Sequence, residues 1–310
     1  MTTLASQLTR TPRIFQSEQA QDARALFPDL APELSELVAG AGSTSPYLLG
    51  LMQKETDWCA AAFTDPEAAV HTVISRLAEV PPDQLAQQLR QAKRRVALMT
   101  GLADLAGAWP LEQVTGILTR LADAACSAAL TSALRTQIKR GKLPGMSEID
   151  AESGAGMTVL AMGKMGAAEL NYSSDIDLIC LFDESRFDPS DFHDARTAFV
   201  RATRAMSGLL NDLTGDGYVV RTDLRLRPDP AVTPVCMAME AAERYYESLG
   251  RTWERAAYIK ARPAAGDIDA GDRFLTALRP FVWRRHLDFA AIQDAHDMRL
   301  AIREHKGLGG

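Results

Sequence analysis

The sequence predicts an α+β protein that is mostly helical, with a small mixed sheet covered by helices and helical regions before and after it. Over residues 1–150, apolar residues recur every three or four positions, which is the helical period. Short apolar runs that are typical of strands begin only at Met157. The length of 310 residues is about twice that of a typical domain. We therefore expect more than one domain.

Amphipathic helices are readable along the first 150 residues. One begins near Leu48, a second at Pro82 and a third at Pro110. Residues 141–156 contain several glycines and a proline without apolar periodicity, which indicates a linker or a loop between domains. The pattern predicts three regions: a helical region at 1–150, a sheet-containing domain at 151–265 and the start of a further helical domain at 266–310.

Three strands are expected after this linker. Met157–Ala161 and Asp175–Phe182 are apolar runs, and Tyr218–Leu226 alternates between apolar and polar residues. A long helical pattern, Asp191–Leu213, separates the last two strands. From Met237 onward the pattern is helical again. This order predicts a small sheet covered by helices.

Two acids stand at the head of the second expected strand. Residues two apart on a strand share a face, so Asp175 and Asp177 are expected to point the same way, roughly 7 Å apart at Cα. Two neighbouring carboxylates repel each other unless a cation lies between them. Oxygen ligands of this kind suit Mg²⁺. The alternative is a solvated strand end that carries two acids by chance.

A glycine-containing turn and a third acid strengthen the interpretation as a site. Gly163 and Gly166 follow the first expected strand, directly before a short helical stretch, where glycines let backbone N–H groups approach a phosphate. In the third strand Asp223 lies on the same face as Arg225 and Arg227. Asp223 could therefore complete a metal site, and the two arginines could contact phosphate oxygens. A plain turn and a solvated edge strand are the alternatives.

Composition excludes several classes of protein. The net charge is −6 and only 6% of residues are aromatic, so neither a basic field nor a base-stacking platform indicates nucleic-acid binding. The four cysteines form no CxxC pair, which favours a reducing compartment. No stretch approaches the roughly 18 uninterrupted apolar residues of a membrane-spanning helix. We expect a cytoplasmic protein with neither a nucleic-acid nor a membrane partner.

Three runs resemble the glutamine synthetase adenylyltransferase/adenylyl-removing enzymes. They are GKMGAAELNYSSDIDLICLFD, YVVRTDLRLRPDP and GRTWERAAYIKARPAAGD, and the similarity extends into FVWRRHLDF. It covers roughly residues 80–305, in an order that matches the family's motifs. Ala167 and Ala168 depart from the family's usual glycines, so close backbone approach is in doubt at Ala167. Because members of this family are far longer, the resemblance implies an N-terminal fragment.

The resemblance implies a nucleotidyltransferase fold and assigns roles residue by residue. It implies catalysis and Mg²⁺ or Mn²⁺ binding by Asp175, Asp177 and Asp223. The positions that resemble the family's nucleotide- and phosphate-contacting residues are Gly163, Lys164, Ser174, Arg225, Arg227, Arg255, Lys260 and Arg262.

The resemblance also implies a reaction. The sequence ELNYSSDIDL and the long helical stretch before it resemble the deadenylylating half of the family. The expected activity is metal-dependent phosphorolysis of adenylyl-tyrosine on glutamine synthetase, which gives ADP. The implied partners are glutamine synthetase, the nitrogen-regulatory signal protein PII, ATP or ADP, and phosphate. The alternatives are adenylylation from ATP of glutamine synthetase or another protein, a nucleotidyltransferase for a small molecule, and a non-catalytic docking or signal-sensing module.

Overall fold

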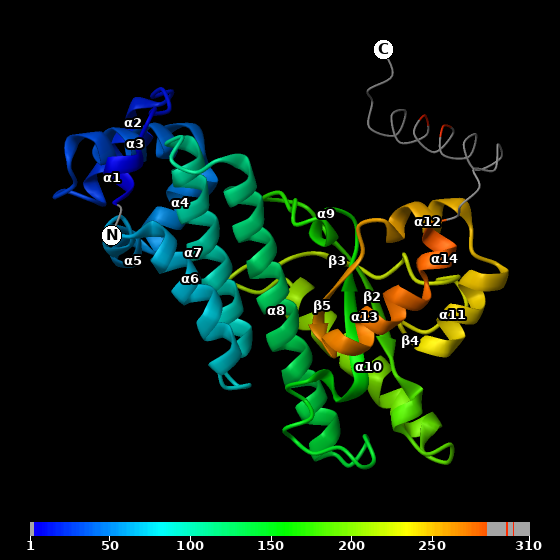
Figure 1. Cartoon of the computed structure of the whole chain (residues 1–310). Coiled ribbons are helices and arrows are strands. Elements are labelled where there is room, and N and C mark those ends of the chain that lie inside the picture. Colours follow the sequence, from blue (N-terminus) through cyan, green and yellow to red (C-terminus); the bar gives the residue numbers. More distant parts are fainter. Residues whose placement is uncertain (1–2, 284–295, 297–299, 301–310) are drawn as a thin grey trace. The chain divides into compact units, whose positions relative to one another are not determined.

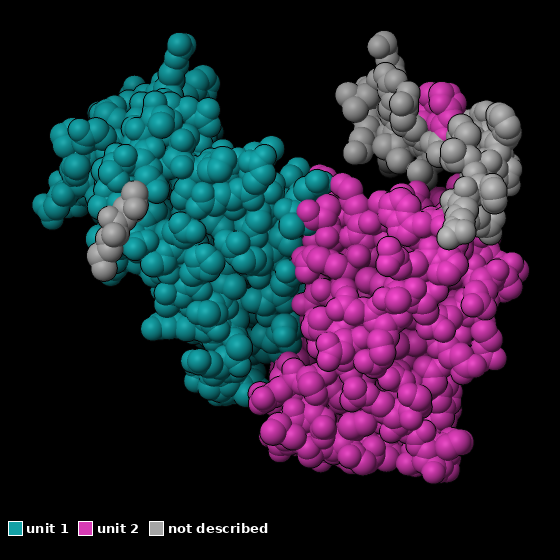
Figure 2. Space-filling view, viewed as in Figure 1, with its two compact units in different colours: residues 1–128, 168–174, 209–220 teal, residues 129–167, 175–208, 221–310 magenta. Residues whose placement is uncertain are grey.

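The computed structural model describes residues 3–283, 296 and 300. The chain divides into two compact units (Figure 2). The first comprises residues 1–128, 168–174 and 209–220, and the second comprises residues 129–167, 175–208 and 221–310. Two of the dividing points fall inside helices. The domain boundaries expected from the sequence remain a prediction.

Helices are the only regular structure among the described residues of the first unit (Figure 1). The helix expected near Leu48 is present as the pair α4 and α5. The helix expected from Pro82 is α7, and the one expected from Pro110 is α8, so these expectations are confirmed. The elements, with the second unit beginning inside α8, are α1 (Leu4–Gln7), α2 (Ser17–Ala25), α3 (Pro32–Thr44), α4 (Pro46–Lys54), α5 (Thr56–Ala62), α6 (Pro66–Ser75), the 3₁₀ helix η1 (Arg76–Glu79), α7 (Leu85–Leu105) and α8 (Leu111–Lys139).

Local sequence explains where these helices begin. Asp65 caps α6, because its Oδ1 accepts a hydrogen bond from the Ala68 backbone N–H at 3.0 Å, and Pro66 fills the first helical position. Ser45 caps α4 in the same way through the Leu48 N–H, at 3.3 Å. The long apolar stripes of α7 then bury Leu89, Val96 and other residues in the helical core.

Helix α8 is the one described helix that is long and apolar enough to cross a membrane by length and composition. In this structure 61% of its most apolar window is buried inside the protein. Because buried core helices have the same composition, α8 is weak evidence for a membrane segment.

The second unit contains a five-stranded mixed sheet (Figure 1). The strand order is β3-β2-β1-β5, and β4 also pairs with β2. Strand β2 is antiparallel to β1 and parallel to both β3 and β4. The strands are β1 (Met157–Ala161), β2 (Ile176–Phe182), β3 (Thr222–Asp223), β4 (Cys236–Ala238) and β5 (Arg262–Gly266).

Helices cover both faces of this sheet. On one face Ile179 and Leu181 of β2 belong to an apolar cluster with residues of the C-terminal helices, among them Phe274. On the other face the ring of Phe182 stacks on that of Phe199 of α10, with centroids 4.9 Å apart. The remaining elements are 3₁₀ helices η2 (Gly154–Gly156) and η3 (Glu184–Arg186), α9 (Gly163–Gly166), α10 (Phe192–Asn211), α11 (Met239–Ser248), α12 (Thr252–Tyr258), α13 (Ile268–Ala277) and α14 (Arg279–Val282). The mostly helical α+β class predicted from the sequence is thus confirmed.

Two local expectations are corrected by the structure. The strand expected over Tyr218–Leu226 is ordered as a strand only at Thr222–Asp223, because the Val219 and Val220 N–H groups donate to the Leu210 carbonyl instead of a sheet neighbour. A short helix was expected after the glycine turn, but the helix, α9, spans Gly163–Gly166 and so consists of the glycine turn itself.

Part of the C-terminal expectation lies outside the described residues. Helices α13 and α14 fall within the helical region expected at 266–310. Most of the FVWRRHLDF run lies outside the described ranges, as do residues 297–299 and 301–310.

Candidate functional site

Strands β2 and β3 bring two of the expected carboxylates side by side. Asp177 is the direct register partner of Asp223 in this parallel pair. The Ile176 N–H donates to the Arg221 carbonyl at 2.9 Å, which fixes the register one residue earlier. Side chains of register partners point to the same face of a sheet. The two acids therefore share one face at the head of the sheet.

Asp177 carries a poorly compensated charge. Burial raises the pKa of its carboxyl above the usual value, and the neighbouring Asp223 and Asp175 raise it further. Arg225 acts in the opposite direction. A half-buried carboxylate among other acids gains the most from an added cation.

Arginines hold the other two acids. Asp175 precedes β2, and its Oδ1 accepts a hydrogen bond from Arg221 Nε at 2.5 Å. Asp223 accepts from both the backbone N–H of Arg225, at 2.8 Å, and its Nε, at 2.9 Å. These bonds from Arg225 are the main cause of the lowered pKa of Asp223. The side chain of Arg225 is itself 82% exposed.

The described residues contain no group of three His, Cys, Asp or Glu side chains placed to hold a metal ion. Arg221 occupies only Oδ1 of Asp175, whereas Arg225 donates to both carboxylate oxygens of Asp223. The donor set of Asp175, Asp177 and Asp223 suits a hard cation, since all of its ligand atoms are carboxylate oxygens. Their assignment as ligands stays a prediction.

The glycine turn packs directly on this site. Gly163 has a left-handed φ of 53°, and a Cβ on it would lie 3.2 Å from Asp177 Oδ2. At Gly166 a Cβ would lie 2.0 Å from the Lys260 carbonyl oxygen, closer than atoms can approach. Ala167, where the sequence raises a doubt, has an ordinary helical φ of −82°, and Ala168 takes the left-handed φ of 60°.

Two residues of the motif at 253–262, Lys260 and Arg262, contact the helix α9 that forms the glycine turn. Arg262 of β5 donates from Nη2 to the Met165 carbonyl of α9 at 3.1 Å. Lys260 contributes its backbone to the close contact with Gly166. The Arg262 side chain and the Lys260 backbone therefore both contact the helix that carries the glycine turn, on which Lys164 is exposed.

Three expected residues are engaged elsewhere. The guanidinium of Arg227 donates to the backbone carbonyls of Leu224 and Thr233, which closes the loop after β3. That of Arg255 lies 5.3 Å from the ring centroid of Phe281. Ser174 belongs to the segment 168–174 of the first unit, where its N–H donates to the Asn171 carbonyl. Their roles as phosphate contacts stay predictions.

One residue of the site was not singled out from the sequence. Arg221 is the ion-pair partner of Asp175 and the backbone partner of β2. Its position in the alternating pattern, on the same side as Asp223 and Arg225, is the signal that could have found it.

The arrangement as a whole defines a class of protein. A small mixed sheet with carboxylates at the head of two neighbouring strands, a glycine turn against them and flanking cations are features of a nucleotidyltransferase-like fold. A sequence profile described as glutamate-ammonia ligase adenylyltransferase matches residues 31–277. The chain belongs to this family.

Curated relatives agree with the family assignment. A protein of Bradyrhizobium sp. strain BTAi1 is 46% identical over 297 residues, with 91% of this chain and 30% of the relative covered. One of Rhodopseudomonas palustris strain CGA009 is 41% identical over 327 residues, with 99% and 33% covered. One of Rhizobium meliloti strain 1021 is 48% identical over 232 residues, with 75% and 24% covered. All three are named bifunctional glutamine synthetase adenylyltransferase/adenylyl-removing enzyme, and this chain spans about a third of their length or less.

Proposed function

We propose that this chain removes adenylyl groups from glutamine synthetase. An oxygen of inorganic phosphate attacks the phosphorus of adenylyl-tyrosine, the bond from phosphorus to the tyrosine oxygen breaks, and that oxygen takes up a proton. The products are ADP and unmodified tyrosine. The family membership and the names of the relatives support the substrate, because those proteins are named for both attaching and removing adenylyl groups on glutamine synthetase.

The observation that carries this proposal is the register of Asp177 and Asp223 beside Gly163. Asp177 is the register partner of Asp223, and its carboxylate lies against Gly163, a position without a side chain. A phosphate can approach the backbone at such a turn, since no Cβ blocks it. Asp177 and Asp223 would then lie next to the position at which the reacting phosphorus is bound.

The carboxylates of Asp175, Asp177 and Asp223 are the groups that would hold Mg²⁺ or Mn²⁺. A bound divalent ion would stabilise the charge on the attacking and leaving oxygens. The raised pKa of Asp177 supports this assignment, because it reflects a carboxylate whose charge is made costly first by burial and then by the neighbouring acids. Arg221 and Arg225 donate hydrogen bonds to the outer two acids, Asp175 and Asp223.

The surrounding cations would bind the anions of the reaction. Arg225 is exposed and close to Asp223, and guanidinium donors match phosphate oxygens two at a time. Lys164 and Lys260 add charge near the glycine turn. Gly163, Ser174, Arg227, Arg255 and Arg262 complete the proposed set of nucleotide and phosphate contacts.

The direction of the reaction rests on the family resemblance. The same carboxylates could serve adenylylation from ATP, and the relatives are named for both activities. A phosphate dianion as attacking group needs several cations near the site, which favours removal. We further propose that PII and ATP or ADP act as partners, and that the reaction takes place in the cytoplasm.

Incubation of the chain with adenylylated glutamine synthetase, inorganic phosphate and Mg²⁺ tests the proposal. We expect ADP to appear in proportion to phosphate, and Asp177→Asn to abolish it. Asp272→Asn is the matched control, because Asp272 is an exposed acid on α13, and this variant should keep the rate of the unchanged chain.

A parallel titration with Mn²⁺ separates the parts of the proposal. Loss of Mn²⁺ binding in Asp177→Asn but not in Asp272→Asn supports the metal site. Transfer of AMP from ATP to unmodified glutamine synthetase, without phosphate-dependent ADP release, would reverse the proposed direction. Absence of both activities together with absence of Mn²⁺ binding would contradict a catalytic role for this chain.

A further inference from the structure

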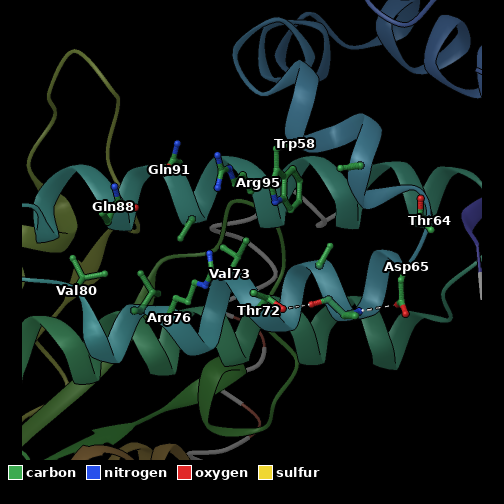
Figure 3. Close-up of a pocket in the computed structure, with 15 residues that line it drawn as sticks. Trp58, Thr64, Asp65, Thr72, Val73, Arg76, Val80, Gln88, Gln91 and Arg95 are labelled. Atoms are coloured by element: carbon green, nitrogen blue, oxygen red, sulfur yellow. Dashed lines mark hydrogen bonds between the residues drawn. The ribbon is translucent and has the colours of Figure 1, made fainter. Parts of the chain in front are cut away.

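The first unit contains a pocket of about 390 Å³ between α5, α6 and α7 (Figure 3). All of its lining residues lie between Trp58 and Arg95, within that unit. Pockets of roughly 300–1,000 Å³ commonly bind small molecules. None of the residues proposed for adenylyl removal lines it.

Small side chains create this hollow. Ala68 and Ala69 of α6 lie opposite Ala92 of α7, where larger residues would fill the space between two packed helices. Val73 and Leu77 continue the same apolar surface. The floor is therefore apolar and suits a flat hydrocarbon body.

Trp58 and Arg95 form one wall of the pocket, and Figure 3 draws them next to each other. The guanidinium carbon of Arg95 lies 5.5 Å from the centroid of the Trp58 ring, a cation–π distance. Its Nε donates to Glu55 Oε2 at 2.7 Å, which fixes the plane of the guanidinium. In the described structure its two terminal nitrogens have no further hydrogen-bond acceptor.

Arg76 gives the pocket a second cation. It comes from η1, beside the apolar floor, and within residues 3–283 its side chain makes neither a hydrogen bond nor an ion pair. Asp65 is the one acid among the lining residues, and its Oδ1 already caps α6. The carboxamides of Gln88 and Gln91 add neutral polar groups. The lining thus offers two guanidiniums and one acid, and the Nε edge of one of them, Arg95, pairs with Glu55 outside the lining.

We propose that this pocket binds a small organic anion with a flat apolar body, whose charged group is held by Arg76 and Arg95. Guanidinium forks match the oxygens of a carboxylate or a phosphate, and both groups fit this chemistry. The flat body lies on the alanines of α6 and α7 beside the Trp58 ring. Binding here is separate from the proposed removal of adenylyl groups.

The probe for this site is 1-anilinonaphthalene-8-sulfonate, a flat apolar anion. Its fluorescence should rise on binding, with energy transfer from Trp58 that is lost in Trp58→Phe. The uncharged analogue N-phenyl-1-naphthylamine should bind at least tenfold more weakly. Benzoate and phenyl phosphate compete in separate titrations, and the stronger competitor identifies the preferred charged group.

Substitutions locate the binding. Arg76→Gln should raise the Kd for the anionic probe about tenfold, since it removes a charged hydrogen-bond donor. Arg204→Gln, which removes an exposed arginine of α10, should leave this Kd unchanged. Ala69→Leu should abolish binding by filling the floor.

Equal Kd values in Arg76→Gln and in the unchanged chain would overturn the proposal. So would equal affinities for the charged and uncharged probes, or probe binding that survives in a folded Ala69→Leu. A thermal melt shows whether Ala69→Leu folds. If it does not, the comparison of Arg76→Gln with Arg204→Gln still tests the proposal, because both arginines are exposed and neither substitution should prevent folding.

Discussion

At the scale of single residues, the glycine turn is the tightest contact near the proposed site. Gly166 has an ordinary backbone conformation, so what restricts this position is space and not φ. A Cβ would lie 2.0 Å from the Lys260 carbonyl oxygen and 2.7 Å from that of Ala161. The glycine therefore lets α9 pack against the segment that leads into β5.

Gly166→Ala should lower the melting temperature, because two backbone carbonyls would have to move. Overpacking of this kind costs roughly 1–3 kcal/mol. Gly50→Ala is the control, since a Cβ on this α4 residue meets nothing within 4 Å, and it should stabilise the helix by about 0.5–1 kcal/mol. Thermal melts of both variants check the prediction, and an unchanged melt for Gly166→Ala would contradict the close contact.

Glu254 shows how burial affects a single charge. It lies at the start of α12, where its Oε2 accepts from the Arg251 N–H at 2.8 Å, and only 2% of the residue is exposed. Burial is the main cause of its raised pKa. A carboxyl whose folded pKa exceeds its unfolded pKa destabilises the fold at pH values above both.

Glu254→Gln should therefore raise the melting temperature near pH 8, since the amide oxygen can still accept from Arg251 without a buried charge. The difference from the unchanged chain should shrink as the pH falls through the raised folded pKa toward the unfolded carboxyl pKa of about 4.3, and it should vanish below that value, where Glu254 is neutral in both states. Melts at pH 8 and pH 4.5 measure this change. A difference that grows on acidification would show that the charged form is the one the fold stabilises.

At the scale of elements, α7 ties the first unit together through its arginines. Arg90 is 3% exposed and donates to the carbonyls of Gly217 at 2.7 Å and Asp212 at 2.5 Å. Arg94 bridges Glu55 and Asp216. Since Glu55 also accepts from Arg95, one buried carboxylate serves two arginines.

Glu55→Gln should destabilise the first unit by about 3–5 kcal/mol, because it removes the buried carboxylate that pairs with both arginines, leaving Arg94 with Asp216 alone and Arg95 without an acid. The control is Glu36→Gln, which breaks the ion pair with Arg24 in which the Glu36 side chain is 54% exposed. Exposed pairs contribute about 0–1 kcal/mol. Urea unfolding, monitored by hydrogen exchange at residues 212–217, measures the loss of stability in each variant. Equal losses in Glu55→Gln and Glu36→Gln would contradict the special role of Glu55.

The sequence predicts long elements better than short ones. Helices α4, α7, α8 and α10 and strand β2 follow from apolar periodicity, since each buries a continuous stripe or run. Strands β4 and β5 were missed: one has three residues, and the other, Arg262–Gly266, reads RPAAG with no β-branched or aromatic residue. Only tertiary pairing with β1 and β2 makes them strands.

The candidate site divides in the same way. The proximity of Asp177 and Asp223 follows from strand parity, and the sheet register agrees with it. The ion pairs of Asp175 with Arg221 and of Asp223 with Arg225 do not follow, because rotamers and loop paths decide which partner a side chain meets. The hydrogen bonds that Arg227 donates to the Thr233 carbonyl likewise depend on the turn at 228–233, which apolar periodicity does not predict.

At the scale of the whole molecule, the two compact units share the chain in an interleaved way. The second unit begins at Ala129, inside α8, and includes the glycine-rich stretch 141–156. The last turns of α8 belong to the second unit, where Leu130 lies against Gly266 and Arg135 pairs with Glu152 at 2.9 Å. The role of residues 141–156 as a linker between domains stays a prediction.

Limited proteolysis can distinguish a loop from a linker. Residues 141–149 are mostly exposed and form turns, with Ile149 74% exposed, so trypsin at Lys142 or a glutamate-specific protease at Glu148 should cut there first. A true linker would release two fragments that separate on size exclusion. We expect the fragments to elute together, because residues 129–139 stay packed with the second unit after the cut. Arg135→Ala would remove the ion pair with Glu152 yet should not free the fragments, since apolar packing at Leu130 remains. Separation of the nicked fragments under native conditions, or a first cut between residues 157 and 226, would contradict this division of the chain.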